Sequence, residues 1–302
     1  MCQGGVSPSS FALLATPFEE DGGVDLFAFD RLLCHVQRGT GGVAVGFPEG
    51  EGESLSPHEF GLLLKEATLF FSGRRQVAAG CFGASTEGVA RLAQVAAQAG
   101  ADLLYLPPPY GVSAGDGGYF CHLNALCSVG LPFLALMPRQ GTASGRPSLI
   151  ASEIARLSCF AGFLVGGLEG QDWGLWHSAH PETPLYMKND CLSLPALFAG
   201  FCGAFSPLSC LLPEEFSLLM KKWKKNDPSA RDLLSALFPL CALLSGRDGG
   251  ALLKWGLHKS GVLSPAMRLP RVLPEGRILA DFERALEEGR RGARMFREKR
   301  GL

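Results

Sequence analysis

Lys188 ends a short apolar run that contains no other charged residue. The run covers residues 184–188 and reads Pro-Leu-Tyr-Met-Lys, and Asn-Asp follows it. A deprotonated lysine amine attacks carbonyl groups, and apolar surroundings favour the neutral amine because burial disfavours the charged form. Lys188 is therefore a candidate nucleophile that could form an imine with a carbonyl substrate. The alternative is that Lys188 only makes a structural ion pair or binds an anion.

Three acids, Glu49, Glu51 and Glu53, lie within five residues of one another in a glycine-containing loop. Neighbouring carboxylates raise one another's pKa, so that one of them could act as a general base. They could equally be exposed acids or, together with Asp190, ion-pair partners of Lys188. A Mg²⁺ site would need more, because neither a second acidic cluster nor a histidine pair at ligand spacing accompanies them. We expect no metal and no cofactor.

The elements that position these residues alternate along the chain. Apolar runs of strand length are followed by segments with helical periodicity, which is the pattern of a parallel sheet with crossover helices. We predict strands over residues 11–15, 43–45, 76–81, 102–106, 132–137, 161–165, 185–188 and 203–205. We predict the intervening helices over residues 25–38, 60–71, 84–99, 119–129, 148–157, 173–179, 192–201 and 213–225.

Eight strand-helix pairs are the number that closes an α/β barrel. The predicted fold is a (β/α)8 TIM barrel over residues 1–226, with a C-terminal helical appendage over residues 227–302. Three helices are expected in the appendage, over residues 230–244, 249–260 and 279–297. Active sites of such barrels lie at the C-terminal ends of the strands, which brings Lys188 and the acidic loop to the same mouth.

The composition argues against several classes of partner. The chain has 302 residues, 47% of them hydrophobic, and a net charge of -1. Its basic residues gather only in the short run 221–225, which we interpret as the solvated end of a helix, so nucleic acid is not expected as a partner. No apolar segment reaches the ~18 residues of a membrane helix and no leader pattern opens the chain, so we expect a cytoplasmic protein without a membrane partner.

The spacing of the ten cysteines does not indicate a disulfide framework. They include no Cys-x-x-Cys pair, and most lie in apolar surroundings, so we predict reduced core thiols. These cysteines are Cys34, Cys81, Cys159, Cys191, Cys202, Cys210 and Cys241. The six histidines fall in predicted helices or their flanks, and none is assigned to catalysis.

Short motifs spread along the chain carry a family resemblance. They are Ala-Thr-Pro-Phe at 15–18, Gly-Glu-Gly at 50–52 with Leu-Ser at 55–56, Pro-Pro-Tyr at 108–110, and Leu-Pro at 269–270 after Gly-Val-Leu at 261–263. In combination and spacing the chain resembles the dihydrodipicolinate synthase and N-acetylneuraminate lyase family over nearly its whole length. The resemblance implies a class I pyruvate-dependent aldolase or lyase, in which a strand-six lysine forms a Schiff base and a strand-five tyrosine carries protons.

The chain departs from the family pattern at these positions. Leu164 occupies the position of the Schiff-base lysine. Ala135 occupies the position of the tyrosine, and no tyrosine lies near it in strand five. Pro48 and Glu49 replace the paired threonines of the second loop. Leucine cannot form an imine and alanine cannot relay a proton, so the family mechanism is lost in its usual form. Lys188 lies on the neighbouring strand, where the family usually has glycine, and could reach the same space.

The resemblance also indicates residues that contact the substrate. Arg139 lies within a residue of an arginine that binds the substrate carboxylate in some members, and otherwise forms a rim salt bridge. Tyr110 resembles a tyrosine that reaches into a neighbouring subunit, which implies a homodimer or homotetramer; otherwise it packs on the adjacent prolines. Ser206 could bind an oxyanion or cap the next turn, and Asp190 and Glu51 complete the candidate binding residues.

Three functions follow. The first is a divergent carbon-carbon lyase or aldolase acting on a 2-oxo acid of the pyruvate type, with Lys188 as a relocated nucleophile and Glu49 as acid or base. The alternative is a catalytically inactive homologue that acts as a binding or regulatory protein. A carboxylate sensor that uses Arg139 and Lys188 without covalent bonding is a third option.

Overall fold

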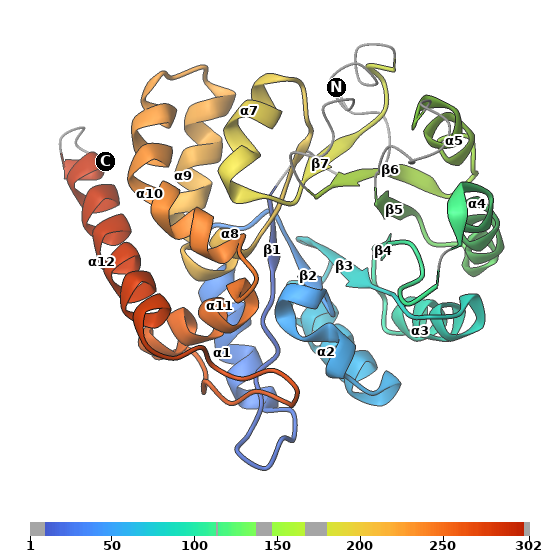
Figure 1. Cartoon of the computed structure of the whole chain (residues 1–302), viewed down its shortest axis with the longest axis horizontal. Coiled ribbons are helices and arrows are strands. Elements are labelled where there is room, and N and C mark those ends of the chain that lie inside the picture. Colours follow the sequence, from blue (N-terminus) through green and yellow to red (C-terminus); the bar gives the residue numbers. More distant parts are fainter. Residues whose placement is uncertain (1–9, 113, 137–146, 167–179, 299–302) are drawn as a thin grey trace.

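The eight strands form a closed parallel barrel in chain order, β1 to β8 (Figure 1). The computed structural model describes residues 10–112, 114–136, 147–166 and 180–298. The strands are β1 (Ser10–Leu13), β2 (Gly42–Val45), β3 (Gln76–Gly80), β4 (Leu103–Leu106), β5 (Phe133–Leu136), β6 (Phe160–Val165), β7 (Leu185–Met187) and β8 (Gly203–Ser206). The predicted (β/α)8 barrel is confirmed.

Helices surround the barrel, and the C-terminal ones gather on one side of it, beside α1 and α9 (Figure 1). They are α1 (Leu26–Val36), α2 (Pro57–Phe71), α3 (Thr86–Gln98), α4 (Gly115–Leu126), α5 (Pro147–Ile154), α7 (Ser193–Phe198), α8 (Pro207–Leu211), α9 (Pro213–Lys224), α10 (Ser229–Leu244), α11 (Gly249–Lys259) and α12 (Arg277–Glu298). The three predicted C-terminal helices are confirmed. The predicted helix over 173–179 lies outside the described residues.

Helix α4 begins four residues before its predicted start at 119. The glycines at 115, 117 and 118 lower the helix propensity of this first turn, which hid it in the sequence pattern. At α2 the local signals were sufficient: Ser56 accepts a hydrogen bond from the Glu59 backbone N–H, and the Glu59 carboxylate accepts one from the Ser56 N–H at 2.9 Å. This capping box fixes where α2 begins.

The barrel interior is filled by side chains from alternate strand positions. Aromatic rings dominate it: Phe11 stacks on Phe205 with ring centroids 4.4 Å apart, and Phe47 stacks on Tyr105 at 4.7 Å. Leu164 lies in this inner cluster and is completely buried. Because the interior is packed, a ligand of this barrel has to bind at the mouth.

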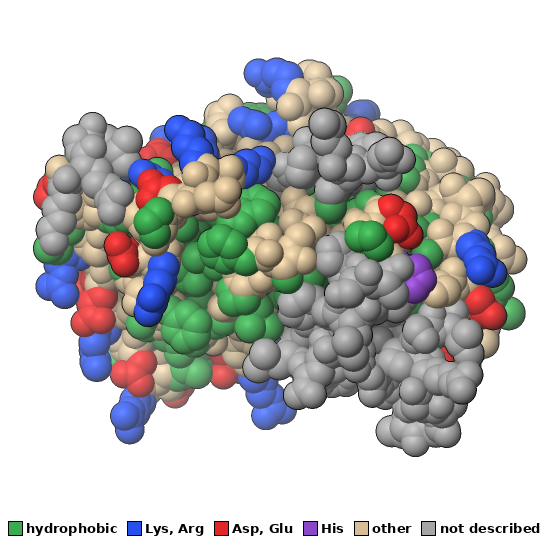
Figure 2. Space-filling view, turned by 90° about the horizontal axis from the view of Figure 1, so that it is seen from above, with side chains coloured by type: hydrophobic (Ala, Val, Ile, Leu, Met, Phe, Trp, Pro, Cys, Tyr) green, Lys and Arg blue, Asp and Glu red, His purple; other side chains and the backbone are tan. Residues whose placement is uncertain are grey.

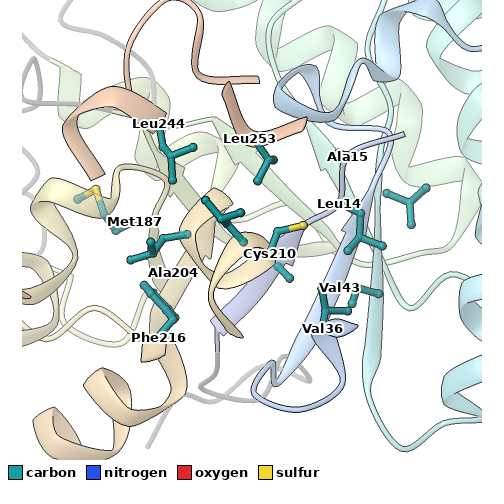
Figure 3. Packing of buried hydrophobic residues seen from close by; sticks show 14 of the residues in the cluster. Leu14, Ala15, Val36, Val43, Met187, Ala204, Cys210, Phe216, Leu244 and Leu253 are labelled. Carbon is teal, nitrogen blue, oxygen red and sulfur yellow. The ribbon is translucent and has the colours of Figure 1, made fainter. Parts of the chain in front are cut away.

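A second, larger apolar cluster lies between the strands and the helices (Figure 3). In it Val43 and Ala204 of the barrel share a core with Leu244 of α10 and Leu253 of α11. The helices after residue 226 therefore pack on the barrel. The division of the chain at residue 226 remains a prediction.

Three features can be compared with the expectations from composition: the surface charges, the length of the apolar helices and the state of the cysteines. In Figure 2 lysine and arginine side chains lie singly or in small groups among acids. Among the described helices none is both long and apolar enough to cross a membrane alone; α10 and α11 meet that test only as a pair bent by 120°. Eight of the cysteines in the described part of the chain are free, but Cys202 is disulfide-bonded, so the prediction of a reduced thiol is wrong there.

Candidate functional site

A pocket of 370 Å³ opens at the mouth of the barrel. Its walls come from the loop after β2, the ends of β4 to β7, and the turn between α10 and α11. The residues that bear on its chemistry are Glu49, Tyr105, Leu136, Lys188, Arg247 and Arg271. Segments far apart in the sequence thus meet at the position where barrels of this type bind ligands.

Lys188 points into this pocket. Its backbone N–H donates to the Val165 carbonyl at 2.9 Å, which extends the pairing of β7 with β6 by one residue. Tyr186 faces the barrel interior and Met187 the helices, so strand alternation turns the Lys188 side chain inward. The Lys188 Nζ lies 2.7 Å from Glu49 Oε1 and 5.6 Å from the centre of the Tyr105 ring.

The Lys188 ammonium and the Glu49 carboxylate form a partly buried ion pair. Burial lowers the pKa of Lys188, but the charge of Glu49, with smaller contributions from Tyr105 and Glu53, outweighs it, and the net pKa is raised. Lys188 is therefore protonated at neutral pH. Glu49 Oε2 is buried and has no hydrogen-bond partner among the described residues. The Glu49 carboxylate thus holds the proton on Lys188.

Tyr105 is a pocket residue that the sequence did not single out. It is 3% exposed, and burial raises the pKa of its phenol, an effect that the Lys188 charge opposes and the Glu49 charge supports. Tyr105 pairs with Leu134 across the β4-β5 ladder, so it reaches the pocket from the strand next to β5. The sequence did contain a signal for it. Tyr105 lies two positions after Leu103 on the same strand, so both side chains face the barrel interior, and Tyr105 is the one nearer the strand end at Pro107.

In strand β5 the residue that faces the pocket is Leu136, whereas the sequence pointed to Ala135. Ala135 packs outward, in the cluster between the barrel and the helices, and Leu136 lines the pocket. The β5-β6 register, in which Leu136 pairs with Leu164, puts these two side chains on the same face. Neither leucine nor Ala135 can carry a proton, so the described residues of β5 offer no proton carrier to the pocket.

Glu51 and Glu53 do not line the mouth pocket. Glu51 adopts a left-handed backbone conformation with φ 64° and turns its buried side chain toward α11, where it forms an ion pair with Lys254. Glu53 pairs with Arg271. Of the three loop acids, the structure brings only Glu49 to Lys188.

Asp190 and Ser206 lie beneath the pocket instead of lining it. Ser206 Oγ accepts a hydrogen bond from the Ser209 N–H at 2.8 Å and so caps α8. Asp190 Oδ2 accepts one from the Leu208 N–H at 2.9 Å. Burial raises the pKa of Asp190 to about 6, although Ser206 and the Leu208 N–H act in the opposite direction. These contacts hold the turn that follows Lys188 against α8.

The raised pKa of Asp190 predicts a pH-dependent stability. The folded protein binds this proton more tightly than the unfolded chain, so the free energy of unfolding should fall as pH rises from about 4 to about 6. A shift of about two pKa units corresponds to about 3 kcal/mol. Asp190→Asn should remove this loss, so that the variant gains about 3 kcal/mol relative to wild type between pH 4 and pH 7 in urea unfolding. A difference between the two proteins that is the same at both pH values would contradict it.

Two other candidates lie away from the mouth pocket or outside the described residues. Tyr110 is 57% exposed and lies 6.4 Å from the Phe82 ring, at a groove of 560 Å³ that α2 and α3 line. Its contact with a second subunit remains a prediction. Arg139 lies outside the residues that the structure describes. Within the described part of the chain, no three His, Cys, Asp or Glu side chains are grouped to hold a metal ion.

Comparisons with known proteins agree with this architecture. The 4-hydroxy-tetrahydrodipicolinate synthase of Leptothrix cholodnii is 27% identical over 288 residues, which is 92% of this chain and 97% of that protein. The solved dihydrodipicolinate synthase of Acinetobacter baumannii, complexed with pyruvate, has a TM-score of 0.85 at 23% identity and covers 96% of this chain and 99% of its own. The N-acetylneuraminate lyase of Mycoplasma synoviae has a TM-score of 0.82 at 18% identity and covers 93% and 97%. The dihydrodipicolinate synthetase family model matches residues 7–288, and the chain belongs to this family.

Proposed function

We propose that this protein is a carbon-carbon lyase or aldolase for a 2-oxo acid, with Lys188 as the residue that forms the Schiff base. The observation that carries the proposal is the Lys188 Nζ, which enters the mouth pocket 2.7 Å from the Glu49 carboxylate and beside Tyr105. A nucleophile, a proton acceptor and a phenol thus meet in one pocket, which are the groups that imine chemistry requires.

The steps follow from these groups. Lys188 reacts as the neutral amine, so the ammonium first loses its proton to solvent, with Glu49 in contact to relay it, and the free amine then adds to the keto carbon of the substrate. Loss of the keto oxygen as water leaves the imine, which draws electrons from the neighbouring carbon and so permits cleavage or formation of a carbon-carbon bond there. Glu49 and Tyr105 are the nearest groups that can return a proton to that carbon.

Borohydride reduction in the presence of pyruvate tests the nucleophile. We expect one reduced pyruvate adduct, located on Lys188 by peptide mass spectrometry and lost in Lys188→Ala. The matched control is Lys65→Ala, which removes an exposed lysine of α2 and should leave the adduct unchanged. An adduct on another lysine, or none across a panel of 2-oxo acids, would exclude Lys188 as the imine former.

The second candidate is a protein that binds a carboxylate without covalent chemistry. The raised pKa of Lys188 favours it, because an ammonium paired with Glu49 is a charge partner and a poor nucleophile. This function predicts saturable binding of pyruvate in calorimetry that Lys188→Ala weakens, without any adduct after borohydride treatment.

We also propose a homodimer or homotetramer. The support is the exposed Tyr110 beside Phe82, together with the family resemblance of the loop that carries it. Light scattering of the purified protein measures this directly.

A further inference from the structure

The mouth pocket carries more positive than negative charge. Three cationic side chains line it, Lys188, Arg247 and Arg271, against one lining acid, Glu49. A pocket with this balance attracts anions, and its field favours ligands with more than one negative charge.

Two of the three cations already have partners within the protein. Lys188 pairs with Glu49. Arg271 pairs with Glu53 and donates to the Pro48 carbonyl at 2.6 Å. Arg247 is exposed, and among the described residues it takes part in no ion pair or hydrogen bond. It is therefore the cation whose hydrogen-bonding capacity is available to a ligand.

The turn that carries Arg247 is held firmly against the site. A Cβ on Gly250 would lie 2.6 Å from both the Glu49 carbonyl and Arg271 Nη1, so the start of α11 packs directly on the loop that bears Glu49. On the other side of the turn, Ser245 Oγ donates to Asn189 Oδ1 at 3.2 Å. The backbone of Arg247 is thus held at the rim of the pocket that Lys188 and Tyr105 also line.

The pocket has room for more than a three-carbon acid. Its 370 Å³ falls within the range of about 300–1,000 Å³ of pockets that take ligands much larger than pyruvate. A ligand whose reactive end meets Lys188 leaves space on the side of the C-terminal helices, where Arg247 stands.

We propose that Arg247 binds a second carboxylate of the substrate, so that the pocket selects 2-oxo acids with a distal carboxylate over pyruvate. That the substrate carries a keto group at its other end rests on the proposed function. The contact between Arg247 and a carboxylate does not require an imine. The planar guanidinium suits a carboxylate because it can donate two parallel hydrogen bonds.

The test uses two five-carbon acids that lack a keto group, glutarate with two carboxylates and valerate with one. In calorimetric titrations glutarate should bind the wild-type protein at least ~10-fold more tightly, which is the effect of about 1.4 kcal/mol from a charge-assisted contact. Arg247→Ala should abolish this preference and leave valerate binding unchanged, and Arg247→Lys should keep part of it. Arg284→Ala, an exposed arginine of α12, is the matched control and should behave as wild type.

Two other results would contradict the proposal that Arg247 binds a distal carboxylate. Equal affinities for the two acids in wild type, including no measurable binding of either, show that no distal carboxylate site exists. A glutarate preference that survives Arg247→Ala and is lost in Arg271→Ala moves the contact to Arg271. Because neither acid can form an imine, these results are separate from the borohydride experiment, which can fail while the glutarate preference stands.

Discussion

Replacing Lys254 by methionine is expected to lower the free energy of unfolding by about 3–5 kcal/mol, the usual result of leaving a buried charge without its partner. The Lys254 side chain is 0% exposed and forms an ion pair with Glu51, which is 3% exposed. Its Nζ also donates to the Ala266 carbonyl at 2.7 Å and lies 4.5 Å from the centre of the Phe18 ring. In Lys254→Met the Glu51 carboxylate would keep, among partners that the described residues supply, only the Arg268 N–H at 3.3 Å.

A double-mutant cycle separates the unpaired charge from the lost packing. The double variant Glu51→Gln with Lys254→Met has no charge at either position, so it should be more stable than Lys254→Met alone. Lys259→Met is the matched control on the same helix, because the Lys259 ion pair with Glu283 is 3.4 Å long and half exposed, and its loss should cost less than about 1 kcal/mol. Urea unfolding followed by circular dichroism measures the wild type, the single variants Glu51→Gln and Lys254→Met, the double variant and the Lys259→Met control. A loss below about 1 kcal/mol for Lys254→Met would refute the prediction.

Replacing Glu49 by glutamine is expected to lower the pKa of Lys188. The carboxylate is the main influence that raises this pKa against the opposing effect of burial, and glutamine keeps the size of the side chain without its charge. A lower pKa means a larger fraction of free amine at a given pH below it. At pH 8, Lys188 should therefore react with an amine-selective acylating reagent about ten-fold faster for each unit by which its pKa falls.

The measurement is the rate of acylation of Lys188 as a function of pH, followed by peptide mass spectrometry. Glu53→Gln is the control: Glu53 contributes less to the Lys188 pKa and is paired with Arg271, so that variant should shift the profile much less. An unchanged or slower reaction in Glu49→Gln would show that the carboxylate does not hold the proton on Lys188. The experiment needs no substrate, so it stands whether or not the protein forms an imine with pyruvate.

The turn of the chain at Glu51 shows why the pairings at the mouth were not predictable from sequence. Glu49, Glu51 and Glu53 are equivalent by residue type and spacing, and each was a possible partner of Lys188. The left-handed conformation of Glu51 sends its side chain to Lys254 on α11, and Glu53 faces Arg271, which leaves Glu49 for Lys188. Each partner lies far along the chain, so the choice exists only once the barrel has closed and α11 has docked.

Tyr105 and Arg247 illustrate the same limit. Tyr105 enters the pocket because β4 lies next to β5 and places alternate side chains inward. Arg247 does so because α11 begins against the loop of Glu49. Neither residue lies in a motif that marks chemistry.

By itself the sequence determined the alternation of strands and helices and the closure of eight strand-helix pairs, since both follow from periodicity within a few neighbouring residues. It also determined that Leu164 cannot form an imine. The tertiary structure alone decided that Lys188 points into the pocket, which carboxylate meets it, which phenol stands beside it, and which of the two pocket arginines has no partner among the described residues. Those are contacts between distant segments, and the physical reason is that their distances are set by the packing of the whole barrel and its C-terminal helices, which no local pattern contains.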